Sequence, residues 1–183
     1  MDSPYLTKRD QRSSLMLKDE TVVTNKTDPE GRCIVFNGQR FNMLFMCFTK
    51  SVEQYFYRLT SAQFGGRGVY RAFAVGLNTY EAAALLRKKW NRFARPVWIG
   101  VDCSRFDAHV TKTVKQMYHS ALRGIFPNRV IKRLLNVLLI HRFRNPYVAG
   151  TCPGSVNSGA PDTTLGNNFM VFAMLLLVQI LGS

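Results

Sequence analysis

The sequence is poor in acidic residues. It contains 11 Asp and Glu against 25 Lys and Arg, which gives a formal net charge of +14 and an isoelectric point near 10.1. A strongly positive protein favours polyanionic partners, because binding releases their counterions. Nucleic acid is therefore the first candidate partner and an anionic membrane surface the second. Charged residues make up only 20% of the chain and hydrophobic residues 46%, a balance that excludes disorder as the main state.

Metal-binding cysteine patterns are missing. The four cysteines share no short spacing and no C-x-x-C, and the three histidines form no zinc pattern with them. The residues are Cys33, Cys47, Cys103 and Cys152, and His109, His119 and His141. Free thiols in a reducing compartment are the simplest interpretation.

Long apolar runs and targeting signals are also missing. The N-terminus has neither a basic region nor an apolar core, which argues against a signal peptide. The apolar run 169–181 contains Gln179 and is shorter than the roughly 20 residues that a spanning helix needs. We therefore expect a buried helix there and no transmembrane segment.

The first half of the chain predicts an arm followed by helices. Residues 1–41 are polar, with a break at 27–31 before the β-type run 33–36, which predicts a strand–turn–strand arm. Apolar residues at helical spacing predict a helix from an N-cap at Asn42 through Leu59. The segment 63–69 contains Gly65, Gly66 and Gly68, which predicts a flexible loop.

A second helix is expected from an N-cap at Thr79 through Phe93, ended by Pro96. Its apolar residues should form an inner face while its Arg and Lys point outward. The inner-face residues are Ala82, Leu85, Leu86 and Trp90, and the basic block is Arg87, Lys88, Lys89, Arg92 and Arg95.

The second half predicts a buried strand and three helices. The run 97–101 is apolar and rich in β-type residues, and it leads directly into Asp102. A helix should follow Asp107 and end at Gly124. The remaining elements are a largely buried helix over 128–140, turns and short strands over 145–157, and a helix that starts near 158–162 and runs to the C-terminus.

Asp102 and Asp107 are the first candidate site residues. A carboxylate at the end of a buried strand suits binding of Mg²⁺ or Mn²⁺ in nucleotidyl transfer, where metal ions stabilise the attacking and leaving oxygens. Asp102 is the expected metal ligand and catalytic residue, with substrate phosphates completing the octahedron. The alternative is that both acids are ordinary turn and helix N-cap residues.

Asp107 is better placed to face a ribose than a metal ion. Paired with Asn167 and with Ser158 or Thr163, it could hydrogen-bond a 2′-hydroxyl, the group that distinguishes RNA from DNA. Ser158 and Gly159 form a flexible turn, and Thr163 and Asn167 are four residues apart and share one helix face. Without the aspartates, Thr163 and Asn167 would count as helix-surface residues.

Basic residues of the N-terminal arm are a third candidate group. Lys18, Lys26, Arg32 and Arg40 are interleaved with β-type residues and could neutralise a triphosphate and its pyrophosphate product. A solvated basic hairpin is the alternative.

These segments together resemble a viral RNA-dependent RNA polymerase of the tombusvirus-like and luteovirus-like positive-strand RNA viruses. The run 101–110, Val-Asp-Cys-Ser-Arg-Phe-Asp-Ala-His-Val, resembles motif A of that family. Ser158-Gly159-x3-Thr163-x3-Asn167 matches its motif B. Lys18-Asp19-Glu20, Arg32-Cys33-Ile34 and Arg40-Phe41-Asn42 resemble the fingertip motif F more loosely, because Gly31 stands where a proline is usual.

The resemblance implies an α+β right-hand polymerase in which residues 1–96 belong to the fingers and 97–183 to a partial palm, an antiparallel sheet packed on helices. It implies an RNA-directed RNA polymerase that adds ribonucleotides to an RNA 3′-hydroxyl with release of pyrophosphate. The expected partners are RNA template and product, ribonucleoside triphosphates and an accessory replicase protein. The expected location is a membrane-associated replication complex in the host cytoplasm.

The family's Gly-Asp-Asp motif C and the thumb are absent, and no acid follows Asp162. We therefore expect a partial polymerase that is inactive by itself. A non-catalytic basic RNA-binding module or defective polymerase remnant is the alternative. A reverse transcriptase is disfavoured by the small Asp107 together with Asn167, and a basic capsid protein would leave the motif order unexplained.

Overall fold

The computed structural model describes residues 6–18, 33–65 and 71–181. Its contacts divide the chain into a first unit, Met1–Thr49 with Arg105–Ser183, and a second unit, Lys50–Ser104. The first unit holds most of the buried hydrophobic residues and both candidate ribose-binding segments.

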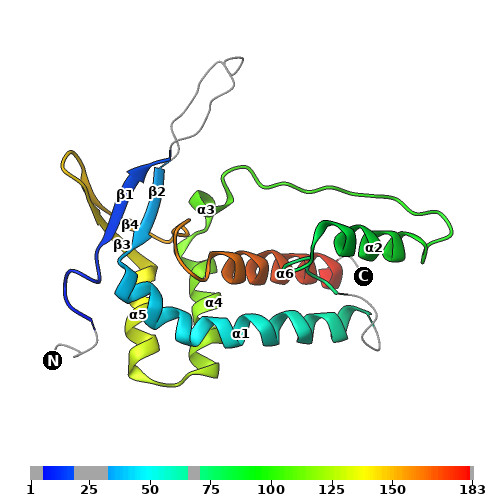
Figure 1. Cartoon of the computed structure of the whole chain (residues 1–183), viewed down its shortest axis with the longest axis horizontal. Coiled ribbons are helices and arrows are strands. Elements are labelled where there is room, and N and C mark those ends of the chain that lie inside the picture. The colour runs from blue at the N-terminus through cyan, green and yellow to red at the C-terminus, as the bar shows by residue number, and fades with distance from the viewer. Residues whose placement is uncertain (1–5, 19–32, 66–70, 182–183) are drawn as a thin grey trace, which may run out of the picture. The chain divides into compact units, whose positions relative to one another are not determined.

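A four-stranded sheet in the first unit has the strand order β2-β1-β3-β4 (Figure 1). β1 (Ser13–Leu17) pairs antiparallel with β2 (Cys33–Asn37), which confirms the two strands of the predicted arm. The predicted break at 27–31 lies outside the described residues. β3 (Ile140–Arg144) pairs antiparallel with β4 (Ala149–Pro153). β1 and β3 pair in parallel at Ser13 and Phe143, which the long connection between them permits. The sheet is thus mixed, and the antiparallel pairing expected for residues 97–183 is present between β3 and β4.

The core of the first unit is formed by helices. α4 (Lys112–Ile125) and α5 (Arg129–Leu139) lie side by side (Figure 1), and Asn128 caps α5 through its side-chain oxygen, which accepts from the Ile131 amide. The helix predicted over 128–140 is therefore confirmed. Fully buried apolar side chains come from these helices and from two further ones: Phe41, Phe45, Leu122, Ile131, Leu134, Leu135, Leu138 and Leu165.

Helix boundaries differ from the predicted ones at several places. The first helix ends at Gly65 and not at Leu59, so it includes the start of the predicted loop, and the second ends at Trp90 and not at Phe93. α1 (Gln39–Gly65) begins before Asn42, whose amide donates to Gly38 inside the first turn. α2 (Thr79–Trp90) is capped by Asn78 in a capping box with Glu81, because the amide oxygen of Asn78 reaches the Glu81 backbone N–H. Gly124 lies inside α4, which ends one residue later.

The second unit corrects two predictions about burial. No residue of α2 is buried, so its expected inner face is not covered by the described residues of this unit. Residues 97–101 are extended but form no strand, and Val97 and Ile99 are about four-fifths exposed, at 81% and 80%. The buried strand predicted there is wrong, because a β-strand exists only through backbone pairing and no strand in the described part of the chain pairs with this run.

α6 (Thr163–Leu181) carries little of the expected burial. Only Leu165, Gly166 and Met170 are buried, whereas Leu175 and Val178 are exposed. It is the one helix among residues 6–18, 33–65 and 71–181 that is long and apolar enough to cross a bilayer, by length and composition alone. A helix that is apolar on all sides fits the core of a larger protein equally well. Within the described part of the chain, the prediction of a buried helix is therefore wrong for the C-terminal half of α6.

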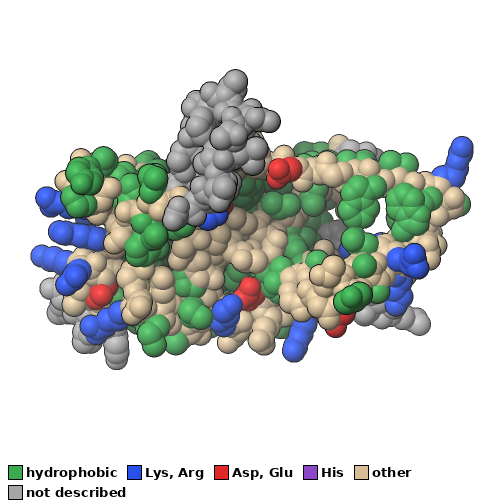
Figure 2. Space-filling view, turned by 45° about the horizontal axis from the view of Figure 1, so that its top comes forward, with side chains coloured by type: hydrophobic (Ala, Val, Ile, Leu, Met, Phe, Trp, Pro, Cys, Tyr) green, Lys and Arg blue, Asp and Glu red, His purple; other side chains and the backbone are tan. Residues whose placement is uncertain are grey.

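The basic composition is visible on the surface. On the face shown in Figure 2, Lys and Arg side chains project outward and few acids accompany them. The Lys and Arg side chains at 87, 88, 92 and 95 are exposed, as the sequence predicts for this block, whereas Lys89 is partly buried.

Candidate functional site

Asp107 and Asn167 meet in the first unit. Asp107 lies in the short helix α3 (Phe106–His109), and Asn167 lies in the first turns of α6. The Asn167 amide Nδ2 donates to the Asp107 carboxylate Oδ1 at 2.8 Å, although the two residues are 60 positions apart in the sequence. The prediction that these side chains come together is confirmed.

The pair retains an unused hydrogen-bonding atom. Asn167 Oδ1 is buried and accepts no hydrogen bond from the described residues. Buried acceptors are almost always paired, so an orphan at a candidate site calls for a ligand donor or a water molecule. The arrangement is therefore suited to a hydroxyl that donates its one proton either to Asn167 Oδ1 or to the Asp107 carboxylate.

Backbone hydrogen bonds hold Asp107 against the loop that precedes α6. The Val156 amide donates to the Asp107 carbonyl at 2.8 Å, and the Ser155 amide donates to the Val110 carbonyl at 2.7 Å. Arg105, just before α3, has a left-handed backbone with φ of 50°, which turns the chain into the helix. The position of Asp107 thus depends on residues 155–156.

A buried polar cluster joins that loop to the arm. The Asn157 side-chain amide donates to Asn37 Oδ1 at 2.9 Å and lies 3.5 Å from Ser13 Oγ, and Asn37 Nδ2 donates to Ser13 Oγ at 3.2 Å. All three side chains are almost fully buried. Because each polar group in the cluster depends on the others, the arm and the loop are fixed together.

Gly159 lies against β2. Its amide donates to the Val35 carbonyl at 3.1 Å, and a Cβ added to Gly159 would lie 2.7 Å from the Cβ of Phe36. The sequence predicted a flexible turn here, whereas the structure shows that the absence of a side chain is needed for close approach of two backbones.

The two hydroxyl residues of motif B are placed differently. The Thr163 hydroxyl lies 2.7 Å from the Asn157 carbonyl and 2.8 Å from the Ala160 carbonyl, so its proton is used within the loop. Ser158 is exposed. The structure therefore brings Asp107 and Asn167 together, gives Thr163 a role in shaping the loop, and leaves Ser158 at the surface.

Asp102 lies in the second unit, in the exposed extended segment that ends before α3. No group of three His, Cys, Asp or Glu side chains suited to a metal ion occurs in the described segments. One exposed carboxylate fits an ion such as Mg²⁺ that takes one or two protein ligands plus phosphates and water, and it does not fit a closed protein cage.

The basic arm residues are only partly described. Lys18 follows β1 and Arg40 lies in the first turn of α1, and both are exposed. Arg32 and Lys26 lie outside the described residues.

A buried charged cluster beneath the loop was missed by the sequence analysis. Lys115 Nζ lies 2.9 Å from His141 Nε2 and donates to the Ser155 carbonyl. Burial lowers the pKa of Lys115 to about 8, opposed by the charge of Asp162, and burial raises the pKa of Asp162 to about 6, opposed by Lys115. Burial also lowers the pKa of His141 to about 4, so its ring is neutral at pH 7, and its Nε2 lies within hydrogen-bond distance of both Lys115 Nζ and the Ser155 carbonyl.

A signal for this cluster is present in the sequence. Lys115 falls on the same helix face as Tyr118 and Leu122, three and seven residues later, and such large apolar side chains mark a face that packs inward. A lysine at such a position is rarely fully buried without a partner.

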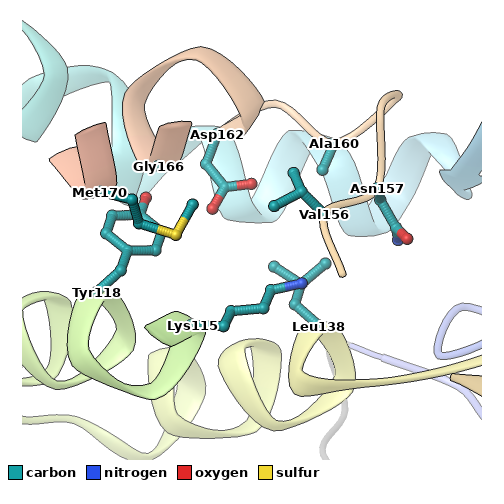
Figure 3. A pocket seen from close by; sticks show the side chains of 9 residues that line it. All are labelled: Lys115, Tyr118, Leu138, Val156, Asn157, Ala160, Asp162, Gly166 and Met170. Carbon is teal, nitrogen blue, oxygen red and sulfur yellow. The ribbon is translucent and has the colours of Figure 1, made fainter. Parts of the chain in front are cut away.

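A cavity of about 10 Å³ adjoins the cluster (Figure 3). Its lining includes Lys115, Tyr118, Asp162, Gly166 and Met170. Figure 3 shows the Lys115 amine entering from α4 and the Asp162 carboxylate from the opposite side. This volume is about the least that admits one water molecule.

Comparison with known proteins shows the family. The family model described as viral RNA dependent RNA polymerase matches residues 2–178. The chain belongs to the viral RNA-dependent RNA polymerase family. The resemblance inferred from motifs A and B is therefore confirmed, and every candidate site residue lies within the matched range.

Curated relatives are RNA-directed RNA polymerases of plant viruses. The protein of groundnut rosette virus (strain MC1) is 33% identical over 174 residues, covering 92% of this chain and 20% of that protein. Those of Cymbidium ringspot virus and tomato bushy stunt virus (strain Cherry) are each 30% identical over 175 residues, covering 93% of this chain and 21% of theirs. The chain thus spans about a fifth of the length of these viral RNA-dependent RNA polymerases.

Proposed function

We propose that this chain supplies the ribose-reading and part of the metal-binding portion of an RNA-directed RNA polymerase. The single observation that carries the proposal is the hydrogen bond between Asp107 and Asn167, one from each of the two motifs. Membership of the viral RNA-dependent RNA polymerase family supports the same reaction.

Ribose selection follows from the donors and acceptors of this pair. The Asp107 carboxylate accepts hydrogen bonds, and Asn167 Oδ1 is a buried acceptor that lacks a donor among the described residues. A 2′-hydroxyl can donate to one of these oxygens, whereas a deoxyribose cannot. A site that leaves a buried acceptor unpaired with the wrong substrate discriminates against that substrate. The loop beside this pair contains Ser158 and Gly159, and the Thr163 hydroxyl donates to carbonyl groups of the same loop.

Asp102 is proposed to hold Mg²⁺ or Mn²⁺ together with substrate phosphates. When bound, such an ion stabilises negative charge on the reacting phosphate and on the attacking and leaving oxygens. Lys18, Arg32 and Arg40 are proposed to neutralise phosphates of the nucleotide or the template.

The proposed assignment places residues 1–96 in the fingers and 97–183 in the palm. In the complete protein, the RNA 3′-hydroxyl attacks the α-phosphate of a ribonucleoside triphosphate and pyrophosphate leaves. Template, product and an accessory replicase protein are the proposed partners, in a membrane-associated complex in the host cytoplasm. The chain alone is proposed to be inactive, because it carries no Gly-Asp-Asp sequence.

The test uses the full-length protein that carries this chain, with a primed RNA template. Asp102→Asn is expected to abolish synthesis while RNA affinity stays within twofold, and Cys103→Ser, an exposed neighbour, serves as its control. Synthesis by Asp102→Asn at the normal rate would reject the metal role.

Asn167→Ala tests ribose selection in the same assay. The ratio of kcat/KM for ribonucleotides to that for deoxyribonucleotides is expected to fall about tenfold to a hundredfold, the effect of losing a hydrogen bond to a buried polar group. Gln179→Ala, an exposed polar residue of the same helix, is the control. An unchanged ratio in Asn167→Ala would reject the ribose role.

A non-catalytic RNA-binding module is the second candidate. The exposed basic block around α2 favours it, because exposed Lys and Arg bind phosphates without regard to sequence. Full RNA binding together with no templated synthesis by the complete protein would support this candidate over the first.

A further inference from the structure

Lys115 occupies an unusual position for a lysine. Its side chain is 5% exposed, in the middle of α4, and its ammonium group is surrounded by groups from several elements. Burying a charge is unfavourable unless hydrogen bonds and an opposite charge compensate. The Ser155 carbonyl and His141 Nε2 lie within hydrogen-bond distance of Lys115 Nζ, and Asp162 supplies the opposite charge. Ser155 and Asp162 lead to the two halves of the candidate site.

The first connection runs from Lys115 to Asp107. Lys115 Nζ donates to the Ser155 carbonyl, and Ser155 is one of two non-glycine residues with a left-handed backbone among the described residues, with φ of 48°. That conformation is unfavourable for a residue with a Cβ and persists only where surrounding contacts hold it. The next amide, from Val156, donates to the Asp107 carbonyl. Lys115 therefore holds the turn on which the backbone of Asp107 rests.

The turn at 154–156 is packed too closely to adopt a different backbone conformation easily. Gly154, which precedes Ser155, has φ of 82°, and a Cβ there would lie 2.7 Å from the Lys112 amide nitrogen. The backbone of residues 154–156 is thus pressed against the segment that joins α3 to α4. A change at the Lys115 contact is expected to move this turn and with it Asp107.

The second connection runs from Lys115 to Asn167. Asp162 is 6% exposed and immediately precedes α6, where its carbonyl accepts the first helical hydrogen bond, from the Gly166 amide at 2.7 Å. The Lys115 amine and the Asp162 carboxylate border the same water-sized cavity (Figure 3). Attraction across this poorly hydrated space draws the start of α6 toward α4. Asn167 lies one turn further along the same helix.

We propose that Lys115 is a positioning residue for ribose recognition, which sets the spacing of Asp107 and Asn167 through the 155–156 turn and through the start of α6. The proposal rests on the proposed function of that pair. Lys115 itself touches no substrate, because its ammonium group is enclosed by protein.

The test compares Lys115→Met with Lys132→Met, an exposed lysine of α5, in the full-length protein. Methionine keeps an unbranched side chain only one atom shorter than that of lysine, and it removes the charge and the hydrogen bonds. We expect the KM for ribonucleotides to rise about fivefold, the KM for deoxyribonucleotides to stay the same and kcat to stay within twofold. A merely structural role would lower the active fraction, and therefore kcat, while leaving both KM values unchanged.

A double-mutant comparison separates this proposal from the one on which it rests. If Lys115 acts through Asn167, adding Lys115→Met to Asn167→Ala causes less than a twofold further loss of selectivity. A full, independent fivefold loss would overturn the positioning role. Normal selectivity in Asn167→Ala alone would instead reject ribose reading by the pair, whatever Lys115 does.

Asp162→Asn provides a second route if Lys115→Met does not fold. It removes the opposite charge with almost no change of shape, and we expect the ribonucleotide KM to rise by about twofold to fivefold. An unchanged KM in a folded Asp162→Asn protein would overturn the connection through α6.

Discussion

Replacing Asn157 with alanine is expected to loosen the arm from the loop that precedes α6. Asn157 donates to Asn37 Oδ1 at 2.9 Å, and both side chains are only 2% exposed. The variant leaves Asn37 Oδ1 buried without this donor, since no water can readily replace a side chain in a fully buried cluster. The contact from Asn157 to Ser13, at 3.5 Å, lies at the limit of a hydrogen bond and adds little.

The magnitude follows from the unpaired acceptor. Leaving one buried neutral acceptor unsatisfied costs about 2 kcal/mol, which corresponds to about a 30-fold increase in the population of the opened state. Opening separates Gly159 from Val35, whose carbonyl accepts the Gly159 amide proton. Hydrogen exchange of the Gly159 amide, read by mass spectrometry on the full-length protein, should therefore be about 30-fold faster in Asn157→Ala.

The control is Ser158→Ala, because Ser158 is the exposed neighbour of Asn157 and should leave exchange within twofold of the unmodified protein. Equal Gly159 exchange in Asn157→Ala and the unmodified protein would refute the reasoning, since it would mean that the buried amide cluster does not hold the arm and loop together.

Two further predictions concern the same loop. Gly159→Ala is expected to destabilise the arm by about 1–3 kcal/mol, because the new methyl group would lie 2.7 Å from the Phe36 Cβ, whereas Gly38→Ala meets nothing within 4 Å and should have little effect; limited proteolysis of the arm compares them. Burial raises the pKa of Asp162 to about 6, so the folded state binds that proton more tightly than the unfolded chain and stability should fall as pH rises from about 4 to 6, on the order of 3 kcal/mol. The free energy of unfolding, measured with urea at each pH, should fall in this way for the unmodified protein and fall less for Asp162→Asn. An equal fall in both proteins would contradict the raised pKa of Asp162.

Local elements followed from local sequence signals. The helix at 128–140 begins at a side chain that caps it, and the arm forms two strands around a break rich in turn residues, so short-range chemistry was sufficient to predict both. The pairing of Asp107 with Asn167 was also predicted, from the complementary chemistry of their side chains, although their separation of 60 residues carries no geometric information.

Burial was the least predictable property. The run 97–101 and the C-terminal half of α6 have the apolar composition of buried elements, yet both are exposed in the described structure. Composition shows that a segment can be buried, but burial requires a partner surface, and that partner is not encoded in the segment itself.

By itself, the sequence determined the basic charge, the main helices, the hairpin arm and the family, because each depends on composition, on periodicity or on motifs that are contiguous in the chain. Only the tertiary structure decided that Lys115 is buried against Ser155, that Gly159 contacts β2 and that Asn157 closes a polar cluster with the arm. These contacts join residues far apart in the chain. Their stability depends on how fully the surrounding protein excludes water, and no local pattern specifies that.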